Sequence, residues 1–91
     1  MIMHKDLYLD YISCRGVGTN DVVASSPASY VSYLNSVAKL INSDITPQIL
    51  RSEIDISTIL RKLKGQRAES TIRNYCSAMR QYVAMVGSKG F

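Results

Sequence analysis

Apolar residues recur along this 91-residue chain at intervals of three and four, the spacing of one helical face, with polar residues between them. The pattern predicts helices over residues 5–14, 27–41 and 69–86, and further helix within 47–64. The most regular stripe is the last one, formed by Ile72, Tyr75, Cys76, Met79, Tyr82, Val83 and Val86. Because no segment alternates strictly and no Asn-Gly or Asp-Gly hairpin signal occurs, the sequence predicts an all-α fold.

Proline, glycine and hydroxyl residues predict where these helices begin and end. Pro27 and Pro47 each follow a Ser or Thr that can cap free backbone N–H groups, and proline fits the first helical position. The Thr46-Pro47 pair predicts that a short helix precedes the main helix within 47–64. Gly87 is expected to end the last helix, and residues 16–26, rich in Gly, Ser, Thr, Asn and Asp, are expected to form a loop.

A weak internal sequence similarity relates the second and the last predicted helices. Residues 29–33 read Ser-Tyr-Val-Ser-Tyr and residues 71–75 read Thr-Ile-Arg-Asn-Tyr, so a hydroxyl residue, an apolar residue and a tyrosine share the same offsets. Two helical hairpins packed on each other would produce such a similarity. Since 91 residues suit one core, we expect residues 1–91 to form a single compact bundle of four to five helices.

The composition offers little material for catalysis, metal binding or membrane insertion. His4 is the sole histidine, and Cys14 and Cys76 fall in separate predicted helices, so we expect no metal or other cofactor. No nucleophile lies in a recognisable catalytic motif, which predicts a non-catalytic domain without a small-molecule substrate. No run approaches the roughly 20 apolar residues of a membrane span. Two cysteines among apolar neighbours suit reduced thiols, and hence the cytoplasm.

Charge is distributed unevenly along the chain. Residues 1–60 hold four Lys or Arg against six Asp or Glu, whereas residues 61–91 hold seven against one, giving net charges of −2 and +6. Such a basic segment is typical of proteins that bind a polyanion, most often nucleic acid. A solvated basic face without a partner is the alternative interpretation.

The strongest candidate for a functional surface is the outer face of the predicted helix 69–86. Arg73, Ser77 and Arg80 share one side at positions i, i+4 and i+7. Long cationic side chains reach phosphate oxygens, and neighbouring amides and hydroxyls add hydrogen bonds. Lys62 and Lys64 extend the charge, although they also suit the dipole at a helix C-terminus. The predicted DNA contacts are Lys62, Lys64, Arg67, Arg73, Asn74, Ser77 and Arg80.

Four motifs are spread over nearly the whole chain: Leu7-x-x-x-Tyr11, Ser26-Pro27-x-Ser29-x-x-x-Tyr33, Asp55-Ile56 and Ser70-Thr71-Ile72-Arg73-Asn74-Tyr75-x-Ser77-Ala78-Met79. Together they resemble the N-terminal core-binding domain of tyrosine recombinases, the phage integrases. Similar helical segments also precede nuclease domains in some bacterial restriction enzymes. The resemblance implies a four-helix, SAM-like bundle that clamps double-stranded recombination-site DNA, while the catalytic residues belong to a separate domain.

A second hypothesis comes from a different functional class. The same bundle would serve as an adaptor that docks a protein partner or a second copy of itself, with Tyr30 and Tyr82 as anchors. A competing interpretation places Tyr30, Tyr33, Tyr75 and Tyr82 in the core or at its rim, because they share stripes with aliphatic residues.

Overall fold

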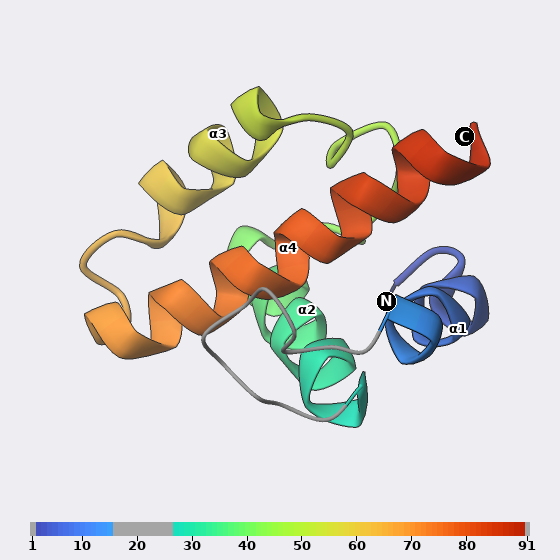
Figure 1. Ribbon diagram of the computed structural model, residues 1–91. Coiled ribbons are helices and arrows are strands. Elements are labelled where there is room, and N and C mark those ends of the chain that lie inside the picture. The colour runs from blue at the N-terminus through green and yellow to red at the C-terminus, as the bar shows by residue number, and fades with distance from the viewer. Residues whose placement is uncertain (1, 16–26, 91) are drawn as a thin grey trace.

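The computed structural model describes residues 2–15 and 27–90, and this part of the chain folds into helices without a strand (Figure 1). The helices are α1 (Lys5–Arg15), α2 (Pro27–Ile41), α3 (Glu53–Leu63) and α4 (Glu69–Lys89). The prediction of a compact all-α bundle is confirmed. The loop predicted at 16–26, including the capping residue expected before Pro27, lies outside the described residues.

α4 is the element on which the other three helices pack. At about 1.5 Å per residue, its 21 residues extend about 31 Å, and the longest dimension of the molecule is 33 Å. α4 contacts α1, α2 and α3, whereas α1 and α3 do not contact each other within the described residues. Figure 1 shows α4, orange to red, crossing α2 and lying between α3 and α1. Its buried residues are Tyr75, Ala78, Met79, Tyr82, Met85 and Val86.

α4 continues past the glycine that was expected to end it. The helix includes Gly87 and ends at Lys89, where Gly90 adopts a left-handed conformation with φ of 74° and donates its N–H to the Val86 carbonyl at 3.0 Å. Glycine is tolerated inside a helix at a cost of about 1 kcal/mol, whereas the left-handed residue after a helix end strongly favours it. The sequence contains two glycines near this end, and only the backbone conformation distinguishes their roles.

The short helix predicted from Pro47 is a single turn. The N–H groups of Ile49 and Leu50 both donate to the Thr46 carbonyl, at 3.2 and 3.0 Å, and no helix follows directly. Pro47 and Leu50 are buried, so the turn presents its apolar side chains to the core. The fold therefore has four helices in its described part, at the lower end of the expected four to five.

A carboxylate prevents this turn from running directly into α3. Asp55 Oδ2 accepts hydrogen bonds from the backbone N–H groups of Arg51 at 2.9 Å and Ser52 at 3.2 Å. Those two N–H groups are therefore not available to carbonyls of the preceding turn. Ser52 has extended backbone angles as the N-cap, so α3 begins afresh at Glu53.

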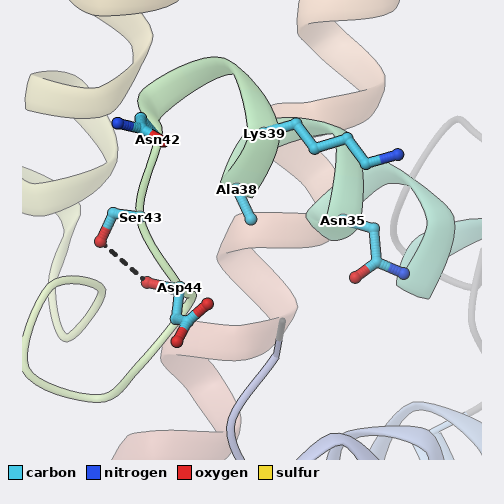
Figure 2. A pocket seen from close by; sticks show the side chains of 6 residues that line it. All are labelled: Asn35, Ala38, Lys39, Asn42, Ser43 and Asp44. Carbon is cyan, nitrogen blue, oxygen red and sulfur yellow. Dashed lines mark hydrogen bonds between the residues drawn. The ribbon is translucent and has the colours of Figure 1, made fainter.

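The end of α2 is closed by two backbone hydrogen bonds around a left-handed residue. The Asn42 N–H donates to the Lys39 carbonyl at 3.3 Å, and the Ser43 N–H donates to the Ala38 carbonyl at 3.0 Å. Asn42 has φ of 55°, which completes a Schellman motif. Figure 2 shows the resulting reversal of the chain, with Lys39 and Asn35 on the helix and Asp44 beyond the turn.

The segment before α1 is held against the segment after α2. Ile2 and Ile45 form an isolated parallel bridge, and the Met3 N–H donates to the Ile45 carbonyl at 2.8 Å. Both isoleucines are buried. The contact joins residues more than forty positions apart, so it ties the start of the chain into the core.

Two tyrosine hydroxyls attach the N-terminal part of the chain to α4. Tyr8 donates to the Ala78 carbonyl at 2.9 Å, and Tyr82 donates to the Met3 carbonyl at 2.8 Å. The two rings lie against each other with centroids 5.7 Å apart. Burial raises the pKa of Tyr82 to about 12, because the apolar surroundings disfavour the phenolate.

The tyrosines are core residues, as one of the two interpretations predicts. Tyr30, Tyr75 and Tyr82 are buried and Tyr33 is half-buried. In α1, an apolar stripe formed by Leu7, Tyr8, Tyr11 and Ile12 at helical spacing would predict that all four face the core, but Leu7 is 37% exposed. Successive helical residues are separated by about 100°, so Leu7 turns away when its neighbour Tyr8 faces α4.

Replacing Tyr82 with Phe should lower the free energy of unfolding by about 1 kcal/mol at neutral pH, because the Met3 carbonyl loses its donor. The pKa of Tyr82 is higher in the folded state, about 12 against 10, so its stabilising contribution is complete below pH 10 and is lost as the pH rises through 12. Urea unfolding followed by circular dichroism should therefore show the difference between wild type and Tyr82→Phe shrinking above pH 10. A constant difference up to pH 11.5 would contradict this account.

Replacing Asn42 with Ala should lower the free energy of unfolding by about 1 kcal/mol relative to Asn42→Gly, because only glycine adopts the left-handed conformation without steric cost. Asn35→Ala is the matched control, since Asn35 is exposed within α2 and alanine has the higher helix propensity. Thermal or urea unfolding of the three variants measures the effect. Equal losses for Asn42→Ala and Asn35→Ala would show that the conformation of Asn42 is not the cause.

Candidate functional site

A groove lies between α3 and the first half of α4, with a volume of about 570 Å³. Both helices and the turn between them contribute to its walls. We name it the basic groove and define it by its lining residues, Ser57, Leu60, Arg61, Lys64, Gly65, Arg67, Glu69, Ile72, Arg73 and Cys76.

The two walls of the basic groove follow directly from helical spacing. On α3 and its C-cap the lining residues begin at Ser57 and recur at i+3, i+4 and i+7, and on α4 they begin at Glu69 and recur at the same offsets. Residues at these offsets lie on one face of a helix. Each helix therefore turns one continuous strip of side chains toward the other.

The turn between the helices places a further cation at the end of the basic groove. Gly65 has φ of 86°, a conformation that a side chain would strain, and it lets the chain reverse after α3. The Gln66 N–H donates to the Leu63 carbonyl at 3.0 Å. Arg67 then donates from Nη1 to the Gln66 carbonyl at 2.7 Å, which restrains the guanidinium beside the turn.

The rim of the basic groove is strongly positive. Arg61, Lys64, Arg67 and Arg73 are all exposed, and Glu69 is the one carboxylate that lines the groove with them. Four positive side chains and one negative side chain give a net charge of +3 at neutral pH. Because these side chains are exposed, an anion in solution can reach them.

The floor of the basic groove is apolar. Leu60, Ile72 and Cys76 are half-buried and pack against the core while also lining the groove. The site therefore combines a hydrophobic surface with a cationic rim. This combination suits a ligand that carries both negative charge and apolar surface.

Three of the residues predicted to contact DNA meet in the basic groove: Lys64, Arg67 and Arg73. Lys62 lies elsewhere, in a small hollow on another side of α3 that Asp55 and Thr58 also line. Arg80 lies about two turns along α4 from Arg73, outside the groove.

Arg80 has a carboxylate for a neighbour. Its Nε lies 3.9 Å from Oε1 of Glu53, and both side chains are largely exposed. An exposed ion pair of this length contributes little to stability, but the carboxylate lowers the positive potential around Arg80. Asn74 and Ser77, also predicted contacts, are half-buried on α4 and do not line the basic groove.

Arg61 is the groove cation that the sequence-based prediction omits. It precedes Lys64 by three positions, so the two share a face of α3, whereas Lys62 is rotated about 100° away. The spacing of Ser57, Leu60, Arg61 and Lys64 at i, i+3, i+4 and i+7 was the sequence signal that groups Arg61 with Lys64 on one face. What the sequence did not supply was which face of α3 turns toward α4.

A second hollow, of about 480 Å³, lies at the end of α2 and is shown in Figure 2. One cation, Lys39, and one carboxylate, Asp44, line it with small polar residues. The Ser43 hydroxyl donates to the Asp44 carbonyl at 3.3 Å. The hollow has no net charge, and the Schellman motif accounts for its shape.

The structure overturns one part of the adaptor hypothesis. Tyr30 and Tyr82, its expected anchors, have no exposed surface, so they cannot insert into a partner. Among the described residues, the most exposed large apolar side chain is Ile54, at 76%. A single exposed isoleucine is ordinary on a protein surface and does not mark an interface.

Neither metal binding nor membrane insertion finds support in the described ranges, 2–15 and 27–90. No three His, Cys, Asp or Glu side chains there come together in a way that could hold a metal ion. None of the helices in these ranges has the length and apolar character needed to cross a membrane.

Comparison with known proteins yields no relative of this chain. No protein-family model matches it, and neither a curated protein nor a solved structure does.

Proposed function

We propose that this domain binds double-stranded DNA through the basic groove and contacts mainly the phosphate backbone. The observation that carries the proposal is the meeting of four exposed cations, Arg61, Lys64, Arg67 and Arg73, around one concave surface. They come from two helices and the turn between them, so packing of the bundle brings them together.

The chemistry of these cations fits phosphate. Three of the four are arginines, whose planar guanidinium groups donate two parallel hydrogen bonds to one phosphate. A duplex carries one negative charge per about 1.7 Å of its axis, so a groove of this size meets several phosphates at once. Release of the counterions bound to those phosphates supplies the binding free energy.

Contacts to phosphate should dominate over reading of bases. Asn74 and Ser77, the polar residues best suited to hydrogen bonds with base edges, are half-buried and lie outside the groove. Phosphate contacts set the position and orientation of a protein on DNA and carry no sequence information directly. We therefore expect weak sequence preference from this domain alone.

At the level of the parent protein, we propose a non-catalytic DNA-clamping domain of a site-specific recombinase or a related cytoplasmic DNA-processing enzyme. The motifs described above support this through their resemblance to core-binding domains. A helical bundle with a cationic face suits the role, because a separate catalytic domain needs a partner that holds the DNA in place.

Binding to a blunt 20-base-pair duplex should weaken steeply with salt, and Arg61→Ala/Arg73→Ala should make the slope of log K against log salt shallower by about two. The two arginines come from opposite walls of the groove, and both are exposed, so the variant should fold. Fluorescence anisotropy between 25 and 200 mM salt, roughly the range in which phosphate contacts are lost, measures both slopes.

Lys5→Ala/Lys39→Ala is the matched control for this experiment. It removes the same charge from exposed positions on α1 and α2, outside the basic groove. The control should keep the wild-type slope. Equal slopes for the two double variants would mean that net charge alone drives binding, and absence of binding by wild type at low salt would overturn the proposed function.

Single substitutions distinguish the groove from the outer face of α4. Arg73→Ala should weaken duplex binding several-fold more than Arg80→Ala, because Arg80 lies outside the groove beside Glu53. Titrations of the two variants at one low salt concentration make the comparison. Similar losses would show that the row of Arg73, Ser77 and Arg80 along α4, and not the groove, faces the DNA.

A further inference from the structure

The floor of the basic groove has a property that binding of a duplex backbone does not use. Phosphates of a duplex are satisfied by the rim cations, and they have no use for the apolar surface of Leu60 and Ile72 below. An unstacked base, in contrast, would bury this apolar surface, since the faces of a base are apolar and pack between aliphatic side chains. Arginine guanidinium planes add stacking surface for the same base.

Resting on the proposed function, we propose that the basic groove holds one unpaired nucleotide of bound DNA, with its phosphates on the rim cations and its base on the floor. The bound species is therefore a duplex with an unpaired base, at a bulge or a strand end. The floor residues Leu60 and Ile72 pack against the base, and Arg61 and Arg73 bind the flanking phosphates.

The size of the groove agrees with a single nucleotide. Its volume of about 570 Å³ lies within the range of about 300–1,000 Å³ that is typical of sites for small organic ligands. Each wall spans seven residue steps of helix, or about 10 Å, which is too short for a long single strand. One base with its two flanking phosphates fits both dimensions.

Glu69 gives the groove a mixed charge that fits a nucleotide better than an acidic peptide. Its carboxylate lines the same space as the four cations. The exocyclic amino groups of adenine and cytosine donate hydrogen bonds to carboxylates, so a nucleotide complements both signs of charge. An acidic peptide would place its own carboxylates beside Glu69.

The first test compares three DNAs: a blunt duplex, the same duplex with one bulged adenine, and the same duplex with a bulged abasic nucleotide. The abasic bulge keeps the extra phosphate and sugar but lacks the base. Because a base packed on the floor removes apolar surface from water on both sides of the contact, the adenine bulge should bind about ten-fold tighter than either of the other two. Equal affinity for the adenine and abasic bulges would overturn the proposal.

Substitution of the floor localises the effect. Ile72→Thr keeps a β-branched side chain but makes the floor smaller and polar, so it should abolish the ten-fold preference for the adenine bulge over the abasic bulge. Ile54→Thr is the matched control, because Ile54 is 76% exposed and lies outside the groove. Loss of the preference in both variants, or in neither, would contradict the assignment to the floor.

A measurement on the unmodified protein covers the case in which Ile72→Thr unfolds. Cys76 lines the groove, so a base on the floor should shield its thiol. The rate of Cys76 alkylation, resolved from that of Cys14 by peptide mapping, should fall several-fold with the adenine bulge and little with the abasic bulge. Equal rates with the two DNAs would count against an occupied floor.

The outcomes separate this inference from the proposed function. If wild type does not bind the blunt duplex, the proposed function fails. If it binds the blunt duplex with the expected salt slope but gains nothing from an unpaired base, the inference alone fails. A synthetic peptide of alternating Glu and Leu that displaces adenine-bulged DNA at equal concentration would also overturn it, in favour of a protein partner.

Discussion

The packing of α4 against all three other helices is the interaction on which the rest of the structure depends. Its apolar face carries six buried residues, and α1, α2 and α3 each cover part of that face. Burial of apolar area supplies most of the favourable free energy of folding in a chain of this size. A disturbance of this face would therefore release the other helices together, and with them the geometry of the basic groove.

Specific hydrogen bonds then fix how the flanking segments meet α4. The hydroxyls of Tyr8 and Tyr82 bond to carbonyls 70 and 79 positions away, so they hold α1 and the chain ahead of it in one orientation. Burying a hydroxyl without a partner is costly, which makes these two bonds a constraint on orientation as well as a source of stability. The Ile2 to Ile45 bridge holds the same N-terminal segment against the chain that follows α2, and the Asn42 turn directs that chain away from the end of α2.

The basic groove arises where the packing of α3 on α4 leaves open space near the turn that joins them. Its apolar floor is the outer edge of the core, and its cations are long side chains at the surface. Leu60 and Ile72 thus contribute both to the core and to the proposed contact with an unpaired base, whereas the arginines that contact phosphate lie outside the core. Substitution of the arginines should leave the core intact, whereas substitution of Leu60 or Ile72 alters its packing.

Much of the fold was determined by the sequence itself. The three- and four-residue intervals predict the helices, because a helix in a small bundle needs one apolar face, and the tyrosines on those stripes are accordingly core residues. Helix ends were harder to predict. The role of Gly90 depends on a left-handed backbone, and the separation of the Pro47 turn from α3 depends on the Asp55 carboxylate capturing two N–H groups.

The residues of the candidate site could be identified only from the tertiary structure. The sequence determined that positive charge gathers after residue 60, but residues on one helix face can be grouped by spacing only within that helix. Which face of α3 meets which face of α4 is decided by burial of Ile56, Ile59 and Leu63 against the core, and that choice turns Arg61 toward Arg73 and leaves Lys62 outside. Contacts between helices depend on packing of the whole bundle, so only the folded chain decided them.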